Sequence, residues 1–358
     1  MKRPLTRFIA AVMLVLIDVT AMSLFRCFPS LFFPTYRIIS KKWIALLSSL
    51  SSAFPFSLWD ILALVLFIIF IVSFVQMIRR RKSFLNWLSI VLLIVSIIGS
   101  EAVLGWMLNH YGPALSEEIG LTIRDYNKQE LYDASEYYLL KAGEYADRIE
   151  RDEEGHALDM DVTEIGVLAG KAYQNIESEY LIFKGSHDRV KRFSLIGDYL
   201  LYNGVIGMFM PVDGEASVPA HVPPVPLAFT MCHEAAHRLG IASEQEANFA
   251  AFMACINSDD IRFLYSGYYS AFSYCFSSLY KNDPELALEL YSKYTDPNIE
   301  LLKQDRRDTN EIYKKYDSPL KEVSDQINDT YLKTFNEESG ILSYSEVTEY
   351  LLAWYLNE

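Results

Sequence analysis

Cysteine is scarce in this chain of 358 residues, which contains only 4. So few thiols exclude a disulfide framework for a chain of this length. Acidic residues are nearly missing from residues 1–108, which carry 3 Asp and Glu against 11 Lys and Arg. No internal repeat or low-complexity tract is present. Apolar residues make up 51% of the chain, which excludes disorder as its dominant state.

Charge is divided unevenly along the chain, with a net of +8 over residues 1–108 and −22 over residues 109–358. Such an acidic second part would repel the phosphates of nucleic acid, so nucleic acid is excluded as a partner. The division also argues against an ordinary water-soluble protein. It predicts a membrane region followed by one domain of about 250 residues.

Three apolar runs, at about residues 8–25, 61–78 and 87–108, are long enough to cross a bilayer as helices. A cleaved signal peptide is the alternative for the first run, but no small-x-small cleavage site follows it. Asp18 and Glu101 lie within the first and third runs. Each costs about 2.5–3.5 kcal/mol at mid-bilayer, so Asp18 needs a partner.

Basic residues predict the orientation of this multi-pass cell-membrane protein. They cluster in residues 2–7 and again in residues 79–82, which places both segments in the cytoplasm. Residues 29–57 and 109–358 then lie outside the cytoplasm, although three basic residues in the first of these segments weaken the case. The lipid bilayer is therefore the first expected partner.

The fold class expected for the second part is mainly α. Apolar and aromatic residues recur at helical spacing, with a possible break at residues 317–319. Residues 204–225 instead alternate β-forming residues with Gly and Pro, which indicates a small β-hairpin or edge segment. The expected helices cover residues 126–151, 160–182, 187–203, 244–257, 260–280, 284–294, 298–336 and 345–356, besides one that starts at Pro226.

One motif carries chemistry, the sequence HEAAH that runs from His233 to His237. On a helix the two imidazoles share a face and can bind one Zn²⁺ ion. The metal lowers the pKa of a bound water, and Glu234 accepts its proton as general base. A core helix with two structural histidines is the alternative. We favour the metal, because the surrounding helix is apolar and a buried His-Glu-His cluster needs partners.

A third metal ligand is expected just after the motif. Gly240 can end the motif helix, and Ser243 resembles the N-cap of the next helix, with Glu246 as its capping-box partner. Glu244 is then free to face the ion and is preferred over Glu246. Asn248, one turn further, is placed to hydrogen-bond a ligating histidine.

HEAAH followed by EQEAN resembles the HExxH and ExxxD motifs of the glutamate-zinc peptidases. That resemblance maps the third ligand onto Glu244 and implies a zincin-like domain, although Asn248 stands where that family has Asp. The short gap with Gly240 also resembles the metzincins, but Ser243 occupies their third-ligand position.

The segments GMFMPVDGEASVP, PLAFTMCHEAAHRLGIASEQEANFAAF, FLYSGY and GILSYSEVTEYL are similar to an uncharacterised family of bacterial membrane proteins, DUF3810. The resemblance covers most of the chain and implies a membrane-anchored zinc peptidase. The family itself has no settled activity, so the resemblance adds little about the substrate.

The flanking segments have two interpretations each. Residues 207–218 either pair with a peptide substrate as an added strand or form a structural hairpin over the site. Tyr265, Tyr268 and Tyr344 are candidate donors to a developing oxyanion, with packing as the simpler role. His187 and His221 are not expected to be ligands.

The leading hypothesis is a membrane-anchored zinc metallopeptidase that acts on a peptide or protein substrate. The alternative is a zinc-stabilised sensor or scaffold that cleaves nothing, and a further protein partner is possible. An intramembrane protease is excluded, because the motif helix between Pro226 and Gly240 is too short to span a bilayer.

Overall fold

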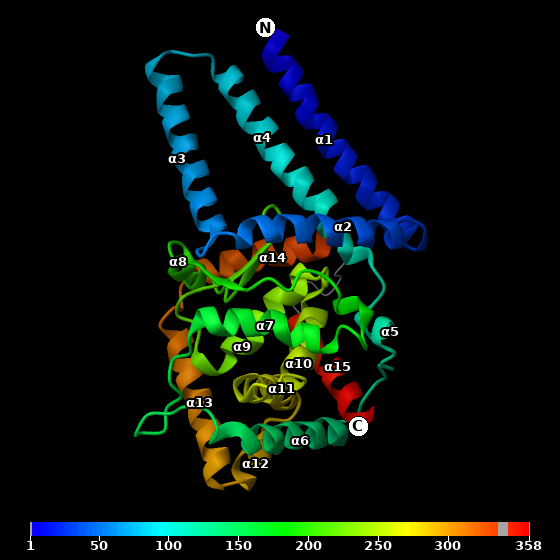
Figure 1. Cartoon of the computed structure of the whole chain (residues 1–358), viewed down its shortest axis with the longest axis vertical. Helices are drawn as coiled ribbons and strands as arrows, with labels where there is room; N and C mark the ends of the chain where they lie inside the picture. Colours follow the sequence, from blue (N-terminus) through cyan, green and yellow to red (C-terminus); the bar gives the residue numbers. More distant parts are fainter. Residues whose placement is uncertain (1, 336–342, 358) are drawn as a thin grey trace.

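The computed structural model describes residues 2–335 and 343–357, and it shows long apolar helices standing on one end of a helical domain (Figure 1). Among these described residues, three candidate spans are long and apolar enough to cross a membrane. They contain the runs at 8–25, 61–78 and 87–108, so the predicted membrane anchor is confirmed. The corresponding helices are α1 (Lys2–Cys27), α3 (Leu58–Arg79) and α4 (Phe84–Gly105).

Both acids of the apolar runs have partners. The Ser100 hydroxyl on α4 donates to the Asp18 carboxylate on α1 at 2.7 Å. The Trp43 indole donates to Glu101 at 2.8 Å. These bonds reduce the cost of placing a carboxylate near or within an apolar layer, and the first of them ties α1 to α4.

The link between the first two spans forms a long helix, α2 (Pro29–Ser52), for which the sequence analysis assigned no structure. It runs across the ends of the spans that are nearest the domain (Figure 1). Ile44 of this helix is part of the main hydrophobic core. Arg37 pairs with Glu118 at 2.8 Å, and Lys41 donates to two backbone carbonyls of the domain. Two basic residues that weakened the predicted orientation are therefore bound to the domain.

The domain is mainly helical, as expected. Its core is built around α9, α10 and α11, which pack on one another. The expected break at residues 317–319 is present between α13 and α14. The elements are η1 (Met107–Tyr111), α5 (Leu115–Ile119), α6 (Lys128–Ala146), α7 (Val162–Ile176), η2 (Leu181–Phe183), α9 (Pro224–Arg238), α10 (Glu244–Ile256), α11 (Ile261–Asn282), α12 (Pro284–Lys293), α13 (Pro297–Lys314), α14 (Leu320–Thr334) and α15 (Ser343–Asn357).

A three-stranded sheet of order β1-β3-β2 lies beside the motif helix α9. The expected hairpin is present as β2 (Met208–Met210) and β3 (Glu215–Val218), which pair antiparallel. The helix predicted over residues 187–203 is wrong in its first part. That segment contains β1 (Lys191–Arg192), which pairs parallel to β3, and only then the short helix α8 (Gly197–Tyr202).

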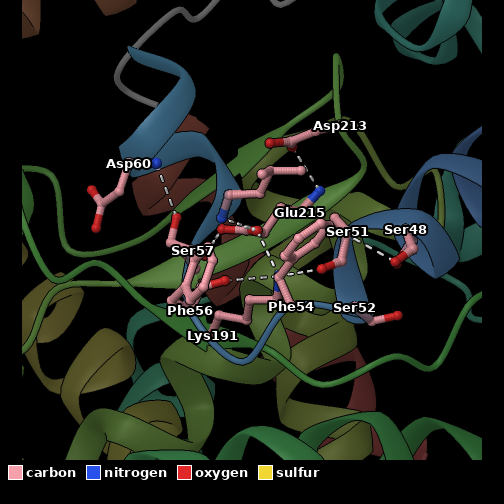
Figure 2. Close-up of polar contacts among 12 residues, drawn as sticks. Ser48, Ser51, Ser52, Phe54, Phe56, Ser57, Asp60, Lys191, Asp213 and Glu215 are labelled. Atoms are coloured by element: carbon pink, nitrogen blue, oxygen red, sulfur yellow. Dashed lines mark hydrogen bonds and ion pairs between the residues drawn. The ribbon is translucent and has the colours of Figure 1, made fainter. Parts of the chain in front are cut away.

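A buried ion pair joins the sheet to the link between α2 and α3 (Figure 2). Lys191 and Glu215 lie 2.8 Å apart, with side chains only 3% and 2% exposed. Lys191 also donates to the carbonyls of Ser51 and Phe56, at 2.7 and 3.1 Å. Nearby, the Asp60 carboxylate in the first turn of α3 accepts backbone N–H groups from residues 194–196. These bonds fix the domain against the base of the spans.

Candidate metal centre

The motif helix α9 has clear start and stop signals. It begins at Pro224, because proline fits a first helical turn, two residues before the predicted start. It ends in a Schellman motif, in which Ile241 N–H donates to the Ala236 carbonyl and Gly240 N–H to that of His237. Gly240 has φ +90°, a conformation that favours glycine. This tight turn directs α10 back toward the histidines.

The turn brings His233, His237 and Glu244 together. Their ligand atoms all lie within 4.8 Å of one another. The two Nε2 atoms are 3.1 Å apart, and Glu244 Oε2 lies 3.2 and 3.7 Å from them. Ligand atoms of a tetrahedral zinc ion stand about 3.3 Å apart, so the three donors fit such an ion. His187 and His221 pair with acids elsewhere and lie outside this cluster.

The imidazole of His237 is oriented with Nε2 toward the cluster. Its Nδ1 lies 2.8 Å from the Ile241 carbonyl, which can only accept, so Nδ1 carries a proton and Nε2 is the nitrogen that faces His233 and Glu244. The carbonyl of His237 accepts the indole N–H of Trp106 at 2.8 Å. His233 Nδ1 is buried without a hydrogen-bond partner among the described residues. The three ligand side chains are between 9% and 14% exposed.

Glu234 lies beside the cluster without being part of it. It is 4% exposed, and its Oε2 has no hydrogen-bond partner in the described part of the chain. Gly207, just before β2, packs directly on this side chain. A Cβ at that position would stand 2.2 Å from Glu234 Oε1. Only glycine therefore leaves the Glu234 carboxylate where it is.

The ionisable side chains of the site shift one another's pKa values. Burial, with a contribution from Glu244, raises the pKa of Glu234 to about 7, although the two imidazoles oppose this. Burial alone would lower the pKa of His237, but the facing Glu244 carboxylate outweighs it and raises that pKa to about 9. Burial would raise the pKa of Glu244, yet His237 and His233 hold it well below its usual range. The ionised Glu244 thus requires a positive charge next to it, which a proton or a metal ion can supply.

The capping box predicted after the motif is wrong. Ser243 is the N-cap residue of α10, but its hydroxyl makes no capping bond and is buried without a partner among the described residues. Glu246 instead accepts the backbone N–H of Leu115 at 2.7 Å and the hydroxyl of Tyr350 at 3.0 Å. Glu246 therefore lies outside the cluster, while Glu244 lies within it.

The predicted tyrosines do not reach the cluster in any described contact. Tyr265 donates to Asp305 at 2.5 Å, and Tyr268 stacks on Tyr145 with ring centroids 5.8 Å apart. Both have the packing role that was the simpler interpretation. The side chain of Tyr344 lies outside the described residues.

One tyrosine near the site escaped the sequence analysis. The hydroxyl of Tyr274 on α11 donates to the Asn248 side-chain oxygen at 3.1 Å. Burial raises the pKa of Tyr274, and the charge of Glu244 raises it further. Asn248 therefore contacts Tyr274 and not a histidine, while its amide nitrogen is buried without a partner in the described residues. No motif in the sequence marks Tyr274, because it comes from a different helix.

The fold and this cluster define a mainly helical, membrane-anchored protein with a candidate site for a divalent metal ion. The chain belongs to the family described as protein of unknown function DUF3810, whose model matches residues 36–352. The resemblance to that family is thereby confirmed. Comparisons with curated proteins and with solved structures found no match. The likeness to the glutamate-zinc peptidases stays a prediction.

Proposed function

We propose that this protein is a membrane-anchored zinc metallopeptidase with Glu234 as general base. One observation carries the proposal: His233, His237 and Glu244 converge on one point, and a further buried carboxylate lies beside them. Three protein ligands leave a fourth tetrahedral position open, which is typical of catalytic zinc sites. The proposal includes a zincin-like role for the helix pair α9 and α10, which carries all three ligands.

The roles of the residues follow from their positions. A bound zinc ion supplies Lewis acidity, which activates a water molecule and polarises the peptide carbonyl. His233, His237 and Glu244 would hold the ion. Glu234 accepts a proton from the attacking water and passes it to the leaving nitrogen. Gly207 keeps the Glu234 carboxylate in place, and the Ile241 carbonyl orients His237 with Nε2 toward the cluster.

The substrate in this proposal is a peptide in extended conformation. Within the described residues β2 pairs only with β3, so its other edge has no strand partner. Gly207, which immediately precedes β2, touches Glu234. A peptide paired with this edge would therefore pass the general base, as in β-strand addition.

We also propose that the domain lies outside the cytoplasm. The N-terminus and the α3–α4 link stand together at the end of the spans remote from the domain (Figure 1). Arg7 donates to Asn86 at 3.1 Å, which joins these two ends. Both segments are basic, and positive charge favours the cytoplasmic side.

The test uses the full chain purified in detergent, with bound zinc measured by mass spectrometry and hydrolysis measured on a peptide library. We expect about one zinc per chain, loss of zinc in His233→Ala, and retention in the matched control His221→Ala. Glu234→Gln should keep its zinc and lose hydrolysis. Wild-type protein without zinc contradicts the metal site. Zinc without any Glu234-dependent cleavage contradicts the peptidase and favours the non-catalytic sensor or scaffold.

A further inference from the structure

The helix α14 presents an apolar stripe that the domain does not cover. Leu320, Val323 and Ile327 follow one another at helical spacing on one face, and all three are exposed, Ile327 by 66%. An isolated exposed Leu or Ile is ordinary on a protein surface, but a stripe on one helix face indicates a binding surface.

A second group of exposed apolar residues surrounds α8, namely Leu195, Tyr199 and Ile206. The two groups lie close together. The ring centroids of Tyr202 and Tyr316 lie 5.2 Å apart, and this contact joins α8 to the segment that leads into α14. We call these six residues, three on each side, the α8–α14 surface.

Contacts with the base of the spans fix the level of this surface. On one side, Asp60 in the first turn of α3 binds the backbone at residues 194–196, which includes Leu195. On the other side, the hydroxyl of Tyr331 on α14 lies 3.2 Å from Nε2 of His110, in the turn after α4. Tyr331 shares its helix face with Ile327, so the stripe continues from a residue that touches the base of a span.

We infer that the α8–α14 surface lies in the headgroup and acyl boundary of the same bilayer that α1, α3 and α4 cross. Figure 1 shows α8 and α14 at the end of the domain that bears the spans. The surface thus lies at the same end of the domain as the membrane region. An interfacial helix with apolar residues on one side and charged residues on the other binds lipid in this way. α14 carries 2 Lys and 3 acids, so burial of apolar groups and not charge drives the contact.

Because the α8–α14 surface contacts the bilayer, the candidate metal centre has a fixed height above the lipid. Ile206, on the α8–α14 surface, is directly followed by Gly207, which touches Glu234. Where the proposed peptidase function holds, the substrates are therefore peptide segments that lie at the membrane surface, close to the anchor of a membrane protein.

The test places an environment-sensitive dye on the full chain in lipid nanodiscs. The exposed Cys27 is changed to Ser, while the other three cysteines are buried and stay unlabelled. A single new cysteine then replaces Ile327, Tyr199 or, as the control, Leu288 on α12 at the far end of the domain. Leu288 is also exposed. Spin-labelled lipids with the quencher near the carbonyl level are included in the nanodiscs.

We expect several-fold quenching and a blue-shifted emission at positions 327 and 199, and neither at 288. Equal insensitivity to the labelled lipids at all three positions would overturn the inference. So would a blue shift at 327 and 199 without lipid quenching, because it would show that a second copy or another protein covers the surface. The readout needs no enzymatic activity, so it is independent of the peptidase proposal.

Discussion

Replacement of Lys191 by methionine removes the cation of the ion pair between the sheet and the α2–α3 link. Methionine fills a similar volume, so packing is largely kept. Glu215 is left as a buried carboxylate that retains two donors, Leu58 N–H at 2.8 Å and the Ser217 hydroxyl at 2.9 Å. The carbonyls of Ser51 and Phe56 lose their shared donor.

The size of the effect follows from the burial of both charges. Breaking a buried ion pair by removing one partner costs about 3–5 kcal/mol, because the remaining charge is uncompensated. In a domain of about 250 residues, each kcal/mol lowers the Tm by about 2–4 °C. Lys191→Met should therefore lower the Tm of the domain by about 6–20 °C.

Thermal unfolding of the full chain, followed by tryptophan fluorescence in detergent, measures this change. The matched control is Lys293→Met, which breaks the exposed pair with Glu136 and should leave the Tm nearly unchanged, because an exposed ion pair contributes little to stability. The double variant Lys191→Met with Glu215→Gln should recover most of the loss, because no unpaired charge remains. Equal Tm changes in both single variants would refute the reasoning.

Three further predictions concern the site and its surroundings. Gly207→Ala should displace the Glu234 carboxylate and lower hydrolysis about 100-fold with zinc content unchanged; the control Gly99→Ala, which meets nothing within 4 Å, should be neutral, and equal rates in both variants would contradict this. Tyr274→Phe should cost about 0.5–1.5 kcal/mol in thermal unfolding through the bond to Asn248 and leave bound zinc unchanged; an unaltered Tm would show that the bond contributes nothing. Burial, and then the charge of Glu215, raise the pKa of Asp213 to about 7, so its contribution to stability is full below about pH 4 and is lost as pH rises toward 7. Asp213→Asn should therefore raise the Tm relative to wild type at pH 8 but not at pH 4, and a gain that is the same at both pH values would exclude this cause.

The local part of the site could be predicted from the sequence. The spacing of His233 and His237 places both on one helix face whatever the rest of the fold does. Gly240 marks the turn that ends the motif helix. Because the turn is short, the first residues of the next helix lie near the histidines, and Glu244 is one of them. The apolar runs predicted the spans for a similar reason, because length and composition alone decide them.

The parts that depend on long-range contacts could not be predicted. Tyr274 reaches Asn248 from another helix, and no local pattern marks that meeting. Gly207 touches Glu234 across 27 positions of sequence, through packing of β2 on α9. The local sequence of residues 187–203 resembles a helix, but β1 forms a strand because its backbone pairs with β3. The tertiary partner outweighed the local preference.

The indole of Trp106 has a consequence for how this protein can exist. It directly follows α4, it is 5% exposed, and its N–H donates to the carbonyl of His237. A protease that released the domain by cutting just after this residue would also remove the side chain that packs against His237. The membrane anchor is thus a structural part of the candidate metal centre, and a domain released by such a cut would lack the contact between Trp106 and His237.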